Sequence, residues 1–157
     1  MNVCLRHCQR RYVGSVAVLA LVLGAAVAQA QSELRSTLFA EADQALKAAN
    51  EARASVLAPS SYSDGVERYR DAEDRLTRGR SIDGIRKQLA EATAAFRKAA
   101  EAAGLAEITF KTALKARADA EQANAGQFAA EAWQEAEQKF ATAAIRLEGG
   151  SVRPARS

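Results

Sequence analysis

Acidic side chains near the middle of the chain are the first residues whose types could support catalysis. Glu67, Asp71 and Asp74 are spaced so that they fall on successive turns of one helix face. Carboxylates grouped in this way can bind metals or act as general acids and bases. Helical two-metal sites also use histidine, and the chain has none after residue 30. Because arginines alternate with these acids, the pattern favours a solvated helix face.

Serines near Pro59 are the second candidates for chemistry. Ser60, Ser61 and Ser63 could act as nucleophiles only beside a base. The single histidine and both cysteines lie among the first eight residues. Serines next to a proline are instead typical of a turn and a helix N-cap. We therefore predict no catalytic residues, no metal site and no cofactor, and a protein that is not an enzyme.

The balance of charge argues against a nucleic-acid-binding protein. The chain has 22 basic and 19 acidic residues, and Arg6, Arg10 and Arg11 account for the net charge of +3. From Gln31 onward basic and acidic residues are therefore equal in number. Nucleic-acid binding needs a clustered basic surface, so we predict no nucleic-acid partner.

Residues 1–30 have the pattern of a secretory signal peptide. Three arginines precede an uncharged apolar run over residues 13–27, and Ala28-Gln29-Ala30 fits a small-x-small cleavage site. The alternative is an uncleaved anchor, but a run of about 15 residues is shorter than the ~20 that span a bilayer. We predict cleavage between Ala30 and Gln31, a periplasmic protein, and no transmembrane segment after cleavage.

Apolar residues at intervals of three and four predict helices in the rest of the chain. Four helices are predicted, over residues 38–56, 62–76, 82–114 and 130–147. The first ends before Pro59, the second at Gly79, and the fourth at Gly149-Gly150. The third has Ser81 as its N-cap and a bend near Gly104. A break is expected at residues 124–126. No window alternates as a strand does, so the predicted fold is all-α, with antiparallel long-helix hairpins forming a small bundle or a tetratricopeptide-like array.

Alanine dominates the predicted helices. Residues 31–157 include 32 alanines but only 21 Leu, Ile, Val and Phe residues, which predicts a thin core. Aromatic residues must then supply much of the burial: Tyr62, Tyr69, Phe96, Phe110, Phe128, Trp133 and Phe140. Acid-first ion pairs four residues apart are expected on the outer faces: Asp71–Arg75, Asp74–Arg78, Glu107–Lys111 and Glu135–Lys139.

A shift of 71 residues superimposes one half of the chain on the other. The informative matches are Phe39 with Phe110, Tyr62 with Trp133, Tyr69 with Phe140, Leu76 with Leu147, and Gly79 with Gly150. We interpret residues 31–148 as one helical domain of two approximate repeats, 39–109 and 110–148. Residues 149–157 are then a flexible tail or a truncation point.

The repeated unit, an alanine stripe followed by Ala-Pro, two aromatics, Ala, Leu and Gly, resembles a known group. It is similar to the alanine-rich helical domains of unknown function in exported Gram-negative envelope proteins, often found ahead of outer-membrane-protein-A-like, peptidoglycan-binding domains. The resemblance covers roughly residues 39–150, and the second unit departs from it with Ala130 in place of Pro59. It implies an envelope location near peptidoglycan. Tetratricopeptide repeats and coiled coils share much of the pattern.

Tyr62 and Trp133 are the candidate partner-binding residues, because each begins a helix just after a turn. Aromatics dominate binding hot spots, although each could instead cap the thin core. The predicted function is a non-enzymatic, exported scaffold or adaptor that binds an envelope protein or self-associates. The alternative is a periplasmic chaperone or binding protein that holds an apolar ligand or client between its helices.

Overall fold

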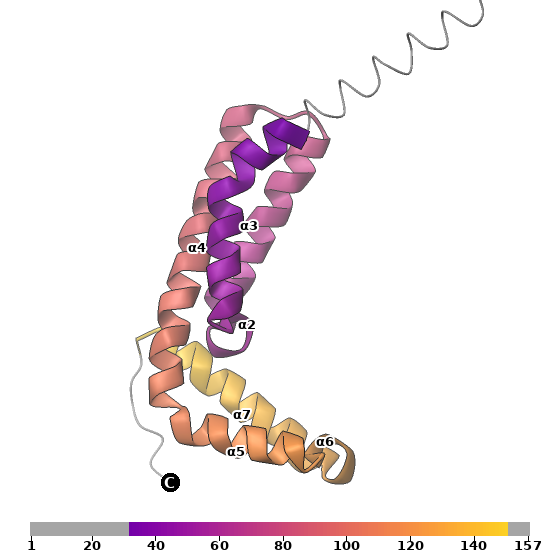
Figure 1. Cartoon of the computed structure of the whole chain (residues 1–157), viewed down its shortest axis with the longest axis vertical. Coiled ribbons are helices and arrows are strands. Elements are labelled where there is room, and N and C mark those ends of the chain that lie inside the picture. Colours follow the sequence, from indigo (N-terminus) through magenta and orange to yellow (C-terminus); the bar gives the residue numbers. More distant parts are fainter. Residues whose placement is uncertain (1–31, 151–157) are drawn as a thin grey trace, which may run out of the picture. The chain divides into compact units, whose positions relative to one another are not determined.

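The computed structural model describes residues 32–150 (Figure 1). Within this range every regular element is a helix and none is a strand, which confirms the all-α prediction. The helices are one over residues 32–51, α2 (Ala54–Leu57), α3 (Pro59–Thr77), α4 (Ile82–Thr109), α5 (Lys111–Gln122), α6 (Ala125–Phe128) and α7 (Ala130–Glu148). None of these helices is both long and apolar enough to cross a membrane. The predicted signal peptide and residues 151–157 of the predicted tail lie outside the described range.

The first helix ends earlier than its apolar stripe predicts. It stops at residue 51, and Arg53 adopts a left-handed conformation with φ 54° before the short helix α2. After this change in chain direction, Leu57 lies in the core with an exposed fraction of 1%, and Val56 is 38% exposed. The expected continuation of the first helix to Val56 is therefore wrong, because burial of Leu57 requires a different chain direction.

Local signals place the junction between α3 and α4 correctly. Gly79 has φ 61°, and its N–H donates to the carbonyl of Leu76 at 3.0 Å. The next N–H, that of Arg80, donates to the carbonyl of Arg75 at 2.9 Å, which completes a Schellman cap. The Ser81 hydroxyl accepts a hydrogen bond of 3.4 Å from the third backbone N–H of α4. The predicted stop and N-cap are both confirmed.

The predicted bend near Gly104 does not interrupt the helix, and the break in the helix comes at Phe110. Helix α4 continues through Gly104 and ends at Thr109, and Phe110 separates it from α5. The break places Lys111 outside the helix that carries Glu107, so the predicted pair between these two residues is also wrong. Glu107 instead pairs with Arg53 at 2.9 Å. The other three predicted pairs are present: Asp71–Arg75 at 2.9 Å, Asp74–Arg78 at 2.7 Å and Glu135–Lys139 at 2.7 Å.

The core centres on Phe96 of α4, which is fully buried. Its ring lies 5.9 Å from that of Tyr62 and 6.4 Å from that of Tyr69, both on α3. Between those two tyrosines α3 carries Gly65, and a methyl group built there would come within 2.6 Å of the Phe96 ring. The glycine therefore allows α3 and α4 to pack closely. Apart from Leu57 and Leu147, the other buried residues of this core are alanines: Ala45, Ala49, Ala54, Ala58, Ala92, Ala99, Ala103 and Ala106.

Helices α5 and α7 lie alongside each other, with α6 at the turn between them (Figure 1). Neither α5 nor α6 has a buried residue. In α7 only Ala144 and Leu147 are buried, and Leu147 belongs to the core around Phe96. The expected burial of Phe128 is wrong, since this side chain is 79% exposed. The described structure thus contains one well-covered helical region and one helix pair with little covering it.

Candidate binding groove

Of the acidic residues considered for catalysis, Glu67 and Asp74 are exposed and Asp71 is half-buried, whereas the candidate serine Ser61 is buried. Glu67 and Asp71 line a polar hollow of about 300 Å³, together with Asp64, Arg68 and Gln88. Asp71 is held by Arg75, and Arg68 pairs with Glu91. Among residues 32–150 no group of three or more acidic, histidine or cysteine side chains is placed to hold a metal ion. Asp71 and Asp74 are thus paired with arginines on a solvated helix face.

The backbone of two helix pairs corresponds residue by residue at a shift of 71. The first pair is residues 40–51 with α3, and the second pair is α5 with α7. Arg53 and Asn124 are both left-handed, with φ of 54° and 55°. Each is followed by a four-residue helix, α2 or α6, and then by a 19-residue helix, α3 or α7. The two pairs are therefore built on the same local geometry.

Burial differs sharply between the two pairs. In the first pair the small residues of the inner face are at most 5% exposed: Ala42, Ala45, Ala49 and Ala72. Their counterparts in the second pair are exposed or half-buried: Ala113, Ala116, Ala120 and Ala143. Helix α4 covers the first face, and none of the described helices covers the second in the same way.

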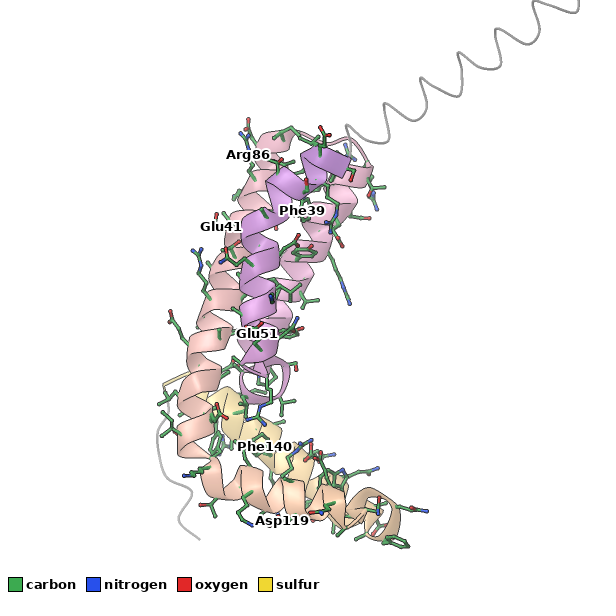
Figure 2. The ribbon with its side chains drawn as sticks, in the orientation of Figure 1. Phe39, Glu41, Glu51, Arg86, Asp119 and Phe140 are labelled. Carbon is green, nitrogen blue, oxygen red and sulfur yellow. The ribbon has the colours of Figure 1, made fainter. Side chains whose placement is uncertain are left out.

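The uncovered face of the second pair forms an apolar groove of about 620 Å³. Trp133 and Phe140 of α7 line it, together with Phe110 at the start of α5. The rings of Phe110 and Phe140 meet edge to face, with centroids 5.5 Å apart. Figure 2 labels Phe140 on α7 and Asp119 on α5, the two helices that bound the groove. Alanines supply most of the remaining lining: Ala113, Ala116, Ala120, Ala125, Ala129, Ala132, Ala136 and Ala143.

An ion pair bridges the two helices of the groove. Nε of Arg117 on α5 donates to Oε1 of Glu137 on α7 at 2.7 Å, and Nη2 donates to Oε2 at 3.1 Å. Nη1 also pairs with Glu121 at 2.9 Å, and the guanidinium lies 5.7 Å from the centre of the Trp133 ring. The hydrogen bond to Glu137 raises the pKa of Arg117 above its ordinary value. A bidentate pair of this kind fixes the distance between the two helices.

The corresponding positions in the first pair are apolar. A shift of 71 residues places Leu46 on Arg117 and Val66 on Glu137. Leu46 and Val66 both pack against the core around Phe96. The second pair therefore has a charged pair at positions where the first has two apolar residues, while both pairs keep aromatic residues at the matching positions. Comparison of the two halves of the sequence could have revealed this substitution, but sequence reasoning missed it.

The two predicted partner-binding residues lie in different environments. Tyr62 contacts Phe96 of α4, and its hydroxyl donates to Oδ1 of Asn50 at 2.7 Å. Trp133, its counterpart, lines the groove and lies beside Arg117. Tyr62 is thus engaged within the chain, whereas Trp133 faces an open surface. Phe110 and Phe140, which were not predicted as binding residues, join Trp133 there.

Glu148 fixes the end of α7 to the beginning of α3. Its Oε2 accepts a hydrogen bond of 3.2 Å from the backbone N–H of Ser61. Its Oε1 is buried and has no hydrogen-bond partner among the described residues. Burial raises the pKa of Glu148, and the hydrogen bonds from Ser61 and Ser60 and the charge of Lys98 offset only part of this effect. Glu148 therefore links the end of α7 to the beginning of α3, and burial of its charged form is unfavourable.

Comparisons with protein-family models, with curated proteins and with solved structures find no match for this chain. Its function is therefore inferred from the groove and from the residues that line it.

Proposed function

We propose that this protein is a non-enzymatic, exported helical-repeat adaptor of the bacterial cell envelope that binds a partner protein in the groove between α5 and α7. The finer architecture belongs to this proposal: two antiparallel helix pairs are successive units of a repeat array. The leader pattern of residues 1–30 supports export to the periplasm after cleavage between Ala30 and Gln31. The resemblance to envelope domains of unknown function supports the location near peptidoglycan.

One observation carries the binding function. Two helix pairs share the same backbone and the same aromatic positions, yet only the first is covered by a third helix. The face that includes Trp133, Phe140 and Phe110 exposes apolar surface to water, and a partner would bury that surface. Aromatic side chains in such a groove are the residue types that contribute most to protein–protein affinity.

Site-specific photo-crosslinking in cells tests the proposal. A photoreactive amino acid at Ala136, in the groove, should form a discrete adduct with an envelope protein. The same amino acid at Ala141, exposed on α7 but outside the groove, is the matched control and should form none. The change Trp133→Ser should remove the adduct from Ala136. Equal adducts at Ala136 and Ala141, or no adduct at either position, would contradict the proposal.

The volume of the groove supports a second candidate function, the holding of a small apolar ligand. About 620 Å³ lies within the range of roughly 300–1,000 Å³ that small-molecule pockets occupy. A ligand holder should bind a fluorescent apolar dye tightly, and Trp133→Ser should weaken that binding. It should also give no protein adduct from Ala136. This combination of results would replace the adaptor with the ligand holder.

A further inference from the structure

The geometry points to a single amphipathic helix of a partner protein as the occupant of the groove between α5 and α7, with an aliphatic residue at its centre and an acidic residue five positions earlier. This inference rests on the proposed adaptor function and adds the kind of partner. It is argued from helix α4, which occupies the equivalent face of the first helix pair.

The contacts of α4 define what such an occupant looks like. Phe96 fills the space between Tyr62 and Tyr69, which are the counterparts of Trp133 and Phe140. The other residues of that α4 face are also buried and occur at intervals of three and four: Leu89, Ala92, Ala99 and Ala103. One central large side chain with small neighbours is thus the pattern that fits between two aromatics on this backbone.

The residue beneath the central side chain differs between the two pairs. Gly65 lies under Phe96, and a methyl group at Gly65 would come within 2.6 Å of the Phe96 ring atoms Cδ1 and Cε1. The counterpart of Gly65 is Ala136, which has that methyl group and lines the groove. A phenylalanine placed as Phe96 is would therefore collide with Ala136. A leucine lacks the Cε and Cζ atoms of the ring, and rotation about its side-chain bonds can turn its Cδ methyl groups away from Ala136. Ala136 therefore determines the preferred size and shape of the central residue.

Charge fixes the register of the occupant. Ion pairs between α4 and its neighbours include Arg68–Glu91, Arg97–Glu41 and Arg53–Glu107. Of these facing residues, Arg68 corresponds to Lys139 and so keeps its charge in the second pair, whereas Glu41 and Arg53 correspond to uncharged residues. Lys139 lines the groove. Glu91 precedes Phe96 by five residues, so a partner helix should carry an acid at that spacing.

A second copy of this chain and a lipid fit the groove less well. A facing copy would offer Ala136 where the hollow between Trp133 and Phe140 needs a large side chain. A lipid chain would cover the charged groups of Arg117 and Glu137 without offering any polar group in return. A helix supplies both a central aliphatic residue and flanking polar side chains.

Binding of peptides to the purified protein tests the inference, with Trp133 as the reporter. Trp133 is the only tryptophan of the chain, and the sequence of α4 contains none, so a change in tryptophan emission reports occupancy of this groove. Two peptides with the sequence of residues 82–109 are compared, one with Phe96 and one with Phe96→Leu. The leucine peptide should bind about tenfold more tightly, since overpacking opposes the phenylalanine.

Two protein variants serve as controls on the size and charge arguments. Ala136→Gly should remove the preference for leucine by restoring the glycine of the first pair. Lys139→Glu should lower the affinity of the protein for the leucine peptide about threefold. The peptide change Glu91→Lys should restore that affinity, because it places opposite charges side by side again. A peptide carrying Leu89→Asp and Ala99→Asp should not bind, because its apolar face is destroyed.

Each outcome has a defined consequence. Equal binding of the two peptides to the wild-type protein and to Ala136→Gly would overturn the argument for the central residue. No emission change with any peptide would overturn the helix inference, yet the adaptor function would stand if Ala136 still formed its protein adduct in cells. A concentration-dependent dimer abolished by Trp133→Ser would identify a second copy as the occupant. Emission changes with phospholipid vesicles alone would identify a lipid.

Discussion

Replacement of Gly65 by alanine examines the close approach of α3 and α4. Alanine in a helix interior is favoured over glycine by about 1 kcal/mol. At Gly104, which also lies inside a helix, an added methyl group meets no atom within 4 Å. Gly104→Ala should therefore raise the free energy of unfolding by about 1 kcal/mol. At Gly65 the same gain is opposed by the Phe96 ring at 2.6 Å. Overpacking of a core costs about 1–3 kcal/mol, so Gly65→Ala should be roughly 1–3 kcal/mol less stable than Gly104→Ala.

Urea unfolding followed by circular dichroism measures both variants. Gly104→Ala is the matched control, because it makes the same chemical change in a helix without the contact. A further variant, Phe96→Ala, removes the ring atoms that clash, so adding Gly65→Ala to it should cost less than in the wild-type protein. If the two glycine variants raise the urea midpoint equally, Phe96 does not lie against Gly65. Ala136 would then no longer be expected to disfavour a phenylalanine in the groove.

Three further predictions concern the core, the groove and the contact between them. Phe96→Ala should lower the free energy of unfolding by about 3–5 kcal/mol in urea, whereas Phe128→Ala at the exposed turn should change it by less than about 0.5 kcal/mol. The pKa of Glu148 in the folded protein is raised above its ordinary value of 4.5, so the folded state holds this proton more tightly than the unfolded state. The free energy of unfolding of the wild-type protein should therefore fall as the pH rises from 4.5 through the folded pKa. Glu148→Gln should remove that fall in urea titrations across this pH range; an unchanged pH profile would exclude Glu148 as its source. Glu137→Val alone should destabilise the protein by leaving Arg117 with one carboxylate partner, and the double change with Arg117→Leu should restore stability in thermal unfolding.

Helix termini governed by local chemistry could be predicted from sequence. Gly79 adopts φ 61°, a conformation that glycine reaches without strain because it has no Cβ. The Ser81 side chain can accept a hydrogen bond from the backbone at the start of the next helix. The C-terminal end of α7 was predicted to within one residue for the same kind of reason, since glycines follow it. These features depend on residues within one or two turns of each other.

Helix breaks set by packing could not be predicted in this way. Arg53 has no intrinsic preference for the left-handed conformation it adopts, and its neighbours continue a helical pattern. Likewise, Phe110 interrupts a stripe that runs unbroken from Ile82 to Leu114 in the sequence. Both interruptions turn the chain toward a new packing partner, and such partners are distant in sequence.

The candidate site was predicted only in part. The sequence treats Tyr62 and Trp133 as equivalent, and their backbone settings are indeed alike. What separates them is whether a third helix covers them, and no local pattern encodes that fact. The exposure of Phe128 escaped prediction for the same reason, because its counterpart Leu57 is buried at the matching position.

The most direct test of the account compares cysteine labelling at two matched positions. Ala45 is 5% exposed beneath α4, and its counterpart Ala116 is exposed in the groove. The variants Ala45→Cys and Ala116→Cys are treated with a maleimide, and peptide mapping by mass spectrometry measures the rate at each site. The cysteine at position 116 should react at least about tenfold faster, because only local opening exposes position 45. Equal rates would contradict the claim that one face is covered and the other open to a partner.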